Sequence, residues 1–517
     1  MILIVLHHHF RPGGVRRVIE KAVPAIVRYD PHNKIERVIL VSGEPIPAEW
    51  MAGFRKNMGK TPVGEKIWTQ ARYASEQFHV DAATWRALLL EWRLWISSLD
   101  NPDILIWTHN LSVGRNASLA HALSEFSRLE PETLQIWTCH DFWFDGRLQR
   151  WPEMRAAGAS SVLDVGQWLF PDSPNVRFAC INHIDYQILH ASTGWRTFYL
   201  PNIAEPAPAI PETEKAAARK LLMDRTGGRG SPAWLIPCRV LRRKNIAESL
   251  LITRLLKPDA WTVTTGQAGS PSEKQYALAL SSHTKTRQWR LHLGILGNDT
   301  PDLPSVAAMI DAAQTILLTS VQEGFGLPFL EAAAARKPLV ARVIPNVMSD
   351  LIQSGLNFPQ TYEELLVPVS LLNWKDERES QRTAWEKWRS LLPAEWSGFA
   401  EAPPALQANN DCVPFSRLTL EGQLDILSHS DDELARACLD MNPRLRPWRE
   451  RAGHGSLAAT EWPPQIEQHL GPRIYASRFW MTADSGISSR PSGSGQSAQD
   501  ALARLKLTSK WLFPILW

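Results

Sequence analysis

The stretch TILLTSVQEGFGLPFLEAAAARKP, residues 315–338, carries the pattern that decides the fold. Its first five residues form a short apolar run, which predicts a buried strand of a parallel sheet. Gly324 and Gly326 predict a loop after that strand, and Pro328 suits the first turn of a helix that begins near Leu327. The stretch therefore predicts one strand–loop–helix unit of an α/β fold.

The predicted loop and helix start offer groups that suit a ligand. Ligands of open α/β sheets collect at the carboxyl ends of strands, so we expect the amides of Phe325, Gly326 and Leu327 to meet an anion such as phosphate. Glu323 and Glu331 flank this helix start and can accept hydrogen bonds from the hydroxyls of a ribose or a hexose. A nucleotide-sugar carries both kinds of group. An ordinary loop, with Glu323 solvated and Glu331 complementing the helix dipole, is the alternative that this pair alone leaves open.

A second charged turn follows another predicted strand. The segment PCRVLRRKNI, residues 237–246, places Arg239 and Lys244 five positions apart. Two cations at the carboxyl end of a strand can neutralise a diphosphate leaving group, arginine as a planar fork and lysine as a point charge. Taken alone, the turn fits a solvated basic loop equally well.

Apolar runs alternate with amphipathic helical segments over most of the chain, which is typical of parallel sheets covered by helices. In the first half the predicted strands are Ile2–Leu6, Arg37–Val41, Ile104–Trp107, Leu134–Thr138, Arg177–Cys180 and Thr197–Leu200, and the predicted helices include Val15–Val27 and Ser118–Ser127. A second alternation has strands at Ala233–Pro237, Trp261–Thr265, Arg290–Leu293, Thr315–Thr319 and Pro338–Val343. Two successive α/β halves are the simplest interpretation.

A proline-rich polar stretch, APAIPETE at residues 207–214, predicts a hinge between the halves. We expect an N-terminal Rossmann-like domain over residues 1–225 and a second Rossmann-like domain over residues 226–445. Residues 446–517 are predicted to form a mostly helical, partly flexible extension. Its apolar end, KWLFPILW, is expected to pack, and peripheral contact with a membrane surface stays open.

The composition narrows the class of protein. In 517 residues, 56 Lys and Arg face 53 Asp and Glu, so no strong field favours nucleic acid as a partner. Five cysteines lack the spacing of zinc or redox sites. The apolar N-terminal run is too short for a signal peptide, and no run approaches the roughly 20 residues of a membrane-spanning helix. We expect a cytoplasmic protein. The 23 tryptophans have no explanation at this level.

Taken together, the motifs resemble a known family. The run EGFGLPFLEA, residues 323–332, and the run RVLRRKN, residues 239–245, are similar to motifs of the retaining GT-B glycosyltransferases, in the large group numbered family 4 or glycosyl transferases group 1. Three further segments agree in order, FRPGGVRRVIE, TCHDFWFDGR and YLPNIAEP. The resemblance covers roughly residues 1–350.

This resemblance implies a GT-B fold, in which two Rossmann-like domains face a central cleft and a terminal helix often crosses back to the first domain. Either Ile474–Trp480 or Asp500–Lys506 is the expected crossing segment. The implied activity is transfer of a hexose from a UDP-, GDP- or ADP-hexose to an acceptor hydroxyl, with retention of anomeric configuration. Because Arg239, Lys244 and backbone amides can stabilise the leaving diphosphate, we expect no metal or other cofactor.

The resemblance also assigns roles to residues of the second half. It implies that Arg239 and Lys244 hold the diphosphate and that Glu331 binds the nucleotide ribose. Glu323 is expected to bind hydroxyls of the donor sugar. The amides of residues 325–327, Phe325, Gly326 and Leu327, are expected to line the sugar and phosphate.

In the first half, the resemblance implies that Gly13 and Gly14 form a loop that lets the backbone approach the diphosphate and acceptor. His140 resembles the family's active-site histidine, which reaches the donor sugar. Two departures are visible. Cys238 stands where the family usually has glycine before the diphosphate arginine, and the loop containing Gly266 matches the family's glycine-rich turn only loosely.

For other polar residues the sequence gives weaker evidence of a functional role. Adjacent residues on a strand point to opposite faces, which argues against a metal site at His7, His8 and His9. Acceptor binding and ordinary helix capping both stay open for polar residues that follow two further predicted strands, namely His109, Asn110, Arg115, Asn182, His183 and Asp185. Asp141 either orients His140 or caps a helix.

Other functions are compatible with the same architecture. Nucleotide-sugar epimerases need acids and bases around the sugar, and phosphorylases typically need a pyridoxal-phosphate lysine, and neither pattern is present. An inactive GT-B protein that binds a nucleotide-sugar or serves as a scaffold is the alternative function. The intact set of Glu323, Glu331, Arg239 and Lys244 argues against such decay.

Overall fold

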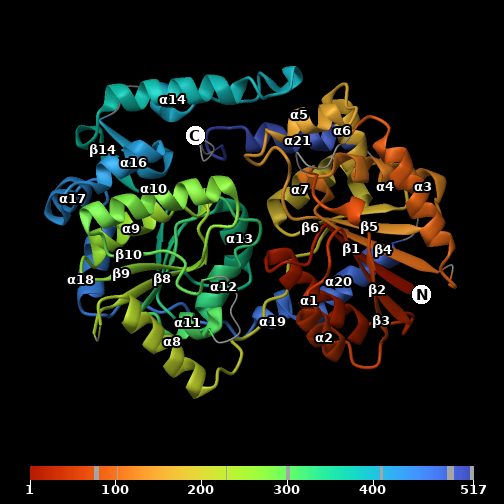
Figure 1. The fold of residues 1–517 in the computed structure, drawn as a ribbon, viewed down its shortest axis with the longest axis horizontal. Coiled ribbons are helices and arrows are strands. Elements are labelled where there is room, and N and C mark those ends of the chain that lie inside the picture. Colours follow the sequence, from red (N-terminus) through yellow and green to blue (C-terminus); the bar gives the residue numbers. More distant parts are fainter. Residues whose placement is uncertain are drawn as a thin grey trace. The chain divides into compact units, whose positions relative to one another are not determined.

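The computed structural model describes residues 1–74, 81–101, 103–228, 230–297, 303–407, 411–485 and 494–512. The described chain forms two compact units (Figure 1). The first contains Met1–Ala204, Trp388–Glu401 and Glu467–Leu512, and the second contains Glu205–Lys387 and Ala402–Ile466. The domain boundaries expected after residues 225 and 445 stay a prediction, because a compact unit is not by itself an independently folding domain.

The first unit is built on a parallel sheet of seven strands in the order β3-β2-β1-β4-β5-β6-β7. The strands are β1 Ile2–His7, β2 Arg37–Ser42, β3 Val63–Ile67, β4 Ile104–His109, β5 Leu134–Cys139, β6 Val176–Cys180 and β7 Thr197–Tyr199. All six predicted strands are confirmed. The sequence did not predict β3, an edge strand whose residues are half-buried or exposed and lack an apolar run.

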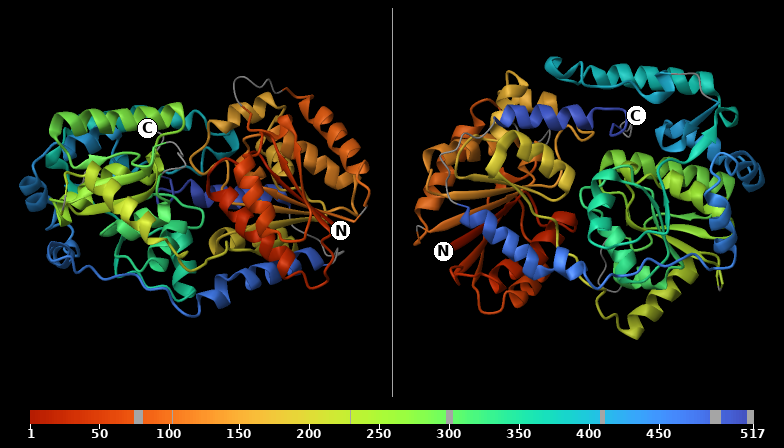
Figure 2. Two further views of the ribbon diagram at one scale, coloured as in Figure 1. Left: turned by 60° about the horizontal axis from the view of Figure 1, so that its bottom comes forward. Right: turned by 180° about the vertical axis from the view of Figure 1, so that it is seen from behind.

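Alternate residues of β1 point into two different cores, as the period of a strand requires. Ile2, Ile4 and Leu6 lie in one buried cluster, whereas Leu3 and Val5 lie in the other. Helices therefore cover both faces of the sheet (Figure 2). They are α1 Gly14–Arg28, α2 Ala48–Asn57, α3 Thr84–Ser97, α4 Ala117–Leu129, α5 Arg150–Ala156, α6 Val162–Leu169, α7 His183–Thr193, α20 Pro472–Asp484 and α21 Gly495–Lys506.

Both candidate crossing segments of the C-terminal region belong to the first unit. Helix α20 packs against α1, and α21 packs against α6 and α7. Phe479 and Trp480 of α20 lie in the core under α1, and Trp480 Nε1 donates to the carbonyl of Ile26 over 3.2 Å. The sequence offered one or the other segment, and the structure uses both.

The second unit contains a parallel sheet of six strands in the order β10-β9-β8-β11-β12-β13. These strands are β8 Ala233–Arg239, β9 Trp261–Gly266, β10 Leu291–His292, β11 Thr315–Leu318, β12 Leu339–Arg342 and β13 Gln360–Tyr362. An antiparallel pair, β14 Leu366–Pro368 and β15 Cys412–Pro414, forms a separate small sheet. The five strands predicted here are confirmed, and β13, β14 and β15 are three-residue strands without a sequence signal.

Helices such as α9, α11 and α12 flank the second sheet (Figure 1), and this part of the chain contains twelve described α-helices in all. They are α8 Glu212–Arg225, α9 Ile246–Leu256, α10 Pro271–Arg287, α11 Val306–Ala312, α12 Leu327–Ala334, α13 Pro345–Gln353, α14 Trp374–Arg389, α15 Pro404–Gln407, α16 Leu420–Leu427, α17 Asp431–Cys438, α18 Leu445–Gly453 and α19 Ile466–Leu470. The last residues of α14 and most of α19 are assigned to the first unit. Two Rossmann-like sheets with a helical C-terminal region confirm the predicted α/β class.

Many of the tryptophans are core residues. In the first unit Trp68 stacks on Trp92 with ring centroids 5.0 Å apart, and Trp143 stacks on Trp396 at 4.9 Å. All four are at most 1% exposed. Large aromatic side chains dominate core energetics, which accounts for part of the unusual tryptophan content. No helix among the described residues has the length and apolarity needed to cross a lipid bilayer.

Candidate active site

Two predicted site residues of the second unit form a buried ion pair. Lys244 ends a short 3-10 helix, Arg242–Lys244, that follows β8, and Glu323 lies in the loop between β11 and α12. The Lys244 ammonium contacts Glu323 Oε1, and both side chains are 9% exposed. Because β8 and β11 are neighbours in a parallel sheet, the loops after their carboxyl ends meet at one edge. The strand–loop–helix pattern and the basic turn therefore belong to one site.

Arg243 also holds Glu323, a contact that the sequence did not predict. Its Nη1 donates to the carbonyl of Gln322 over 2.9 Å and lies 3.4 Å from Glu323 Oε2. From a third segment, Asn346 Nδ2 at the start of α13 donates to the carbonyl of Glu323 over 2.9 Å. Arg243 lies inside the basic run RVLRRKN, so the sequence could have indicated it as a site residue. No feature of the sequence indicated that Asn346 would contact Glu323.

The charges around Glu323 fix its protonation state. Burial by itself raises the pKa of this carboxyl, but the charges of Lys244 and Arg243 outweigh burial and lower the pKa to about 2. Glu323 is therefore a carboxylate at neutral pH. It is an acceptor of hydrogen bonds and a weak base.

Arg239 ends β8 and lies in a different part of the same edge. Its side chain runs along the backbone at the end of β9 and beyond. Two distances show this: a Cβ added to Gly269 would lie 2.8 Å from Arg239 Nη1, and a Cβ added to Gly266 would lie 2.8 Å from Arg239 Cγ. Among the described contacts Arg239 pairs with neither Glu323 nor Lys244. Arg239 is an exposed residue.

Cys238 lies among these charged groups. Burial raises the pKa of its thiol to about 11, although the charges of Lys244, Arg243 and Arg239 lower it. The thiol is thus neutral at physiological pH. β8 continues through Cys238 and pairs Arg239 with Gly266, but the register with β9 shifts between Ile236 and Arg239, so the strand end that carries Cys238 is irregular.

The start of α12 is built as predicted. Gly326 is the N-cap with φ +80°, a left-handed conformation that favours glycine, and Leu327 is the first helical residue. A Cβ on Gly326 would also lie 2.4 Å from Val347 Cγ1, so the packing excludes a side chain. Phe325 is buried, and Glu331 is half-buried one turn into the helix.

Gly13 and Gly14 stand where β1 leads into α1, Gly13 as its N-cap and Gly14 as its first residue. Gly13 has φ 169°, extended backbone that any residue adopts. The atom nearest to a Cβ on Gly13 would be the Arg11 carbonyl oxygen at 3.9 Å, and a Cβ on Gly14 would meet nothing within 4 Å. The fold of this unit therefore does not demand glycine here. That glycine is required at these positions so that a ligand can approach the backbone closely stays a prediction.

His140 follows β5 and is 8% exposed. Its Nε2 lies 3.0 Å from Nδ1 of His109, the last residue of β4. Burial lowers the pKa of His140 to about 4. Asp141 does not bond to His140 but pairs with Arg147 over 3.0 Å. The sequence named His109 only as one of several polar residues after a strand, and nothing in it indicated that His109 would contact His140.

The loop after His140 is held by α21. Lys506 Nζ lies 3.0 Å from Asp185 Oδ1 and 3.9 Å from Asp145 Oδ1, with all three side chains buried. Trp143 Nε1 donates to Gln499 Oε1 over 3.1 Å. The C-terminal helix therefore supports the loop that carries His140.

The remaining candidates serve mainly as caps and core residues. Asn182 Oδ1 accepts from the backbone N–H of Asp185 over 2.9 Å and so caps α7. His7 and His8 are buried at the end of β1, where His8 Nδ1 donates to the Ala71 carbonyl over 2.7 Å. In the described part of the chain, no group of three or more His, Cys, Asp and Glu residues is arranged to hold a metal ion.

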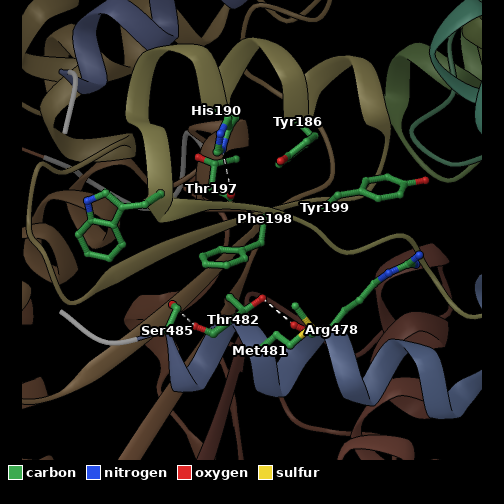
Figure 3. Close-up of a pocket in the computed structure, with 10 residues that line it drawn as sticks. Tyr186, His190, Thr197, Phe198, Tyr199, Arg478, Met481, Thr482 and Ser485 are labelled. Carbon is green, nitrogen blue, oxygen red and sulfur yellow. Dashed lines mark hydrogen bonds between the residues drawn. The ribbon is translucent and has the colours of Figure 1, made fainter. Parts of the chain in front are cut away.

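A separate hollow of about 520 Å³ lies along the edge strand of the first unit (Figure 3). Side chains of α7, β7 and α20 line it, and Figure 3 shows Tyr186 and Tyr199 on one side and Met481 on the other. Its polar groups include Arg478, which lies over the Tyr199 ring at 5.5 Å. The predicted site residues are absent from its lining, so this hollow is distinct from the His140 loop.

Comparison with known proteins shows which family the second unit is similar to. Residues 231–361, which contain the ion pair and the start of α12, match the family described as glycosyl transferases group 1. This match and the two relatives described next support a GT-B glycosyltransferase. It is 24% identical over 379 residues to mannosylglucosyl-3-phosphoglycerate synthase of Petrotoga mobilis, covering 71% of this chain and 69% of that protein. It is 26% identical over 280 residues to mannosylglucosylglycerate synthase of Thermotoga maritima, covering 50% of this chain and 62% of that one.

Solved structures agree on the fold. Anabaena HepE in complex with UDP-glucose superposes with a TM-score of 0.53 at 13% identity, over 94% of this chain and 100% of that chain. The same protein with UDP and glucose gives a TM-score of 0.51 at 12% identity, over 94% and 99% of the two chains. At this identity the likeness establishes the GT-B fold and not the substrates. The predicted fold and family are thus confirmed.

Proposed function

We propose that this glycosyltransferase moves a hexosyl group from a nucleoside-diphosphate hexose to an acceptor hydroxyl with retention of anomeric configuration. The observation that carries the proposal is the convergence of Lys244, Arg243 and Glu323 at the carboxyl ends of β8 and β11. This convergence lies inside the segment that matches the family. It brings the Glu323 carboxylate, which suits sugar hydroxyls, together with the cations Lys244 and Arg243, which suit a diphosphate.

Lys244 and Arg239 are the proposed partners of the diphosphate. When the bond between the anomeric carbon and the diphosphate breaks, negative charge grows on the leaving oxygen, and positive groups near it stabilise the transition state. The amides of Phe325, Gly326 and Leu327 add donors at the start of α12. The proposal needs no metal, because these groups supply the positive charge.

Glu323 is the proposed acceptor for hydroxyls of the donor sugar. A carboxylate offers about four lone-pair sites, so contacts with Lys244 and Arg243 leave capacity for hydroxyl hydrogens. Its pKa of about 2 makes it a poor proton acceptor, which argues against a role as general base. Glu331, one turn into α12, is the proposed ligand of the ribose.

The chemical step balances without a protein base. The bond from the anomeric carbon to the diphosphate oxygen breaks, and a bond to the acceptor oxygen forms on the same face of the sugar. The acceptor's proton passes to the departing phosphate oxygen. His140 is proposed to bind a hydroxyl of the donor sugar, and Gly13 and Gly14 to let backbone approach the diphosphate and acceptor.

The names of the relatives suggest an acceptor class to test first. Both name a mannosylglucosyl product, in one case of glycerate and in the other of 3-phosphoglycerate. A glucoside with an anionic glycerate or phosphoglycerate group is therefore the first acceptor to try, with GDP-mannose among the donors. UDP- and ADP-hexoses complete the donor panel, since the contacts that select the base lie in loops without a readable pattern.

Thermal denaturation with each donor tests the binding half of this proposal. A ligand that binds only the folded protein raises its melting temperature, by an amount that grows with ligand concentration. We expect one nucleotide class to stabilise the wild-type protein and to stabilise Lys244→Ala much less. Stabilisation by a nucleotide-sugar without any transfer to an acceptor would support the inactive, binding-only alternative.

A further inference from the structure

The geometry around His140 points to a specific role for His109. His109 is fully buried at the end of β4, where its ring packs against Trp107 with centroids 4.4 Å apart. The rings of His109 and His140 lie 5.3 Å apart at an interplanar angle of 24°. Their nearest nitrogens, His109 Nδ1 and His140 Nε2, are 3.0 Å apart, which is the distance of a hydrogen bond.

This contact couples the tautomers of the two rings. Burial lowers the pKa of His109 and of His140, so both rings are neutral at physiological pH. A neutral imidazole has one N–H donor and one bare acceptor nitrogen. The hydrogen bond between His109 Nδ1 and His140 Nε2 contains a single hydrogen, which one of the two rings supplies. The accepting ring must then carry its own hydrogen on its other nitrogen.

The far nitrogen of His109 decides between the two arrangements. His109 Nε2 is buried and has no hydrogen-bond partner among the described residues. If His109 accepted from His140, its own hydrogen would sit on Nε2 as an orphaned buried N–H, which is rare in proteins, whereas an unpaired acceptor is less unusual. The favourable arrangement places the hydrogen of His109 on Nδ1, from which it donates to His140 Nε2.

We infer that His109 is a positioning residue that holds His140 as the Nδ1–H tautomer, so that His140 presents a hydrogen-bond donor to an oxygen of the donor sugar. This inference rests on the proposed function for the identity of the ligand. The tautomer itself follows from the contacts of this unit alone. His140 Nδ1 has no partner among the described residues and is the nitrogen that remains for a ligand.

The two tautomers predict different chemistry at His140. With hydrogen on Nδ1, the ring donates to a sugar oxygen and cannot accept a proton at that nitrogen. With hydrogen on Nε2, Nδ1 would be an acceptor and could act as a base. The inference therefore excludes His140 Nδ1 as a general base and assigns it to hydrogen-bond donation.

Nitrogen-15 NMR of protein labelled at histidine tests the tautomer directly, because protonated and bare ring nitrogens differ in chemical shift. The chain has 15 histidines, so spectra of His140→Gln and His109→Phe serve to assign the two rings by loss of signals. In the ligand-free wild type we expect protonated Nδ1 in both rings. Protonated Nε2 in His140 would overturn the inference. If His109→Phe does not fold, His140→Gln and the wild-type spectrum still decide.

Kinetics test the consequence for transfer. His109→Phe removes the donor but keeps a ring in the core, and His109→Asn restores an N–H near the position of Nδ1. We expect kcat of His109→Phe to fall roughly tenfold, the effect of one lost hydrogen bond, with partial recovery in His109→Asn and little change in KM for the donor. Equal kcat in wild type and His109→Phe would contradict the positioning role.

The outcomes separate this inference from the proposed function. The tautomer is measured without any sugar, so the predicted Nδ1–H state with no transfer from any nucleoside-diphosphate hexose would refute the proposed function and the sugar contact. The tautomer assignment would then stand. Transfer activity together with Nε2–H in His140 would refute the role of His109 and leave the proposed function intact.

Discussion

Lys244 and Glu323 form a buried ion pair although 79 residues separate them in the chain. The pair exists because β8 and β11 are adjacent in the second sheet, which brings the loop after each strand to the same edge. When no ligand is bound, the charges of Lys244 and Glu323 compensate each other. Removing one partner is therefore expected to disturb both the site and its local stability.

Lys244→Ala should lower turnover by about 10²-fold or more, since it removes a positive charge from the diphosphate. The measurement is steady-state transfer with saturating donor. Lys274→Ala is the matched control, because Lys274 is an exposed lysine on α10 of the same unit. Wild-type turnover in Lys244→Ala would remove Lys244 from the mechanism.

Gly326→Ala should damage the start of α12. An alanine in the left-handed conformation costs roughly 1–2 kcal/mol, and its Cβ would collide with Val347. We expect a lower melting temperature and weaker donor binding in calorimetry. Gly53→Ala is the control, because a Cβ on that residue of α2 meets nothing within 4 Å. An unchanged melting temperature in Gly326→Ala would show that the loop is not built as described.

Much of the fold could be predicted from the sequence because parallel strands are continuous apolar runs between turn residues. The run at β11 and the glycine and proline after it predicted the strand, loop and helix start correctly. The short strands β13, β14 and β15 were missed, because three residues give no period to detect. Edge strand β3 was missed because its half-exposed residues carry no apolar run.

The site was predictable where one segment carries several functional groups. Lys244 and Glu323 were both named, and their contact followed once the strand order was known. Asn346 and the contact of His109 with His140 were not predictable, since a single polar residue after a strand looks the same whether it caps a helix, binds a ligand or holds another side chain. Only the strand order β4-β5 brings His109 next to His140.

The first unit should lose stability as the pH falls from about 6.5 to about 4. His140 has an ordinary pKa of 6.5 when exposed in the unfolded chain and about 4 in the folded protein, so the unfolded state binds more protons in this window. Its contribution to stability is complete above pH 6.5 and is lost as the pH approaches 4.

Melting temperatures of wild type and His140→Asn across this range check the effect. We expect the variant to show a shallower decline, because it has lost one of the groups responsible. Parallel curves for the two proteins would mean that His140 is not held neutral by burial.

Lys506→Met should destabilise the first unit by about 3 kcal/mol, because it leaves the carboxylates of Asp145 and Asp185 buried without their cation. Burial already raises the pKa of Asp145 to about 6, and loss of Lys506 should raise that pKa further. Urea unfolding followed by tryptophan fluorescence measures the change. Lys56→Met on the exposed surface of α2 is the control and should stay within roughly 0.5 kcal/mol of wild type.

The central claim is transfer from a nucleoside-diphosphate hexose with retention, and proton NMR of the complete reaction tests it most directly. UDP-, GDP- and ADP-hexoses are supplied with a glucoside acceptor that carries a glycerate group, and the anomeric signals of donor and product are followed over time. We predict that one donor is consumed, with one nucleoside diphosphate released per new glycosidic bond and the anomeric configuration of the donor kept in the product. Inverted configuration would contradict retention, and no consumption of any donor with any hydroxyl acceptor would contradict the claim as a whole.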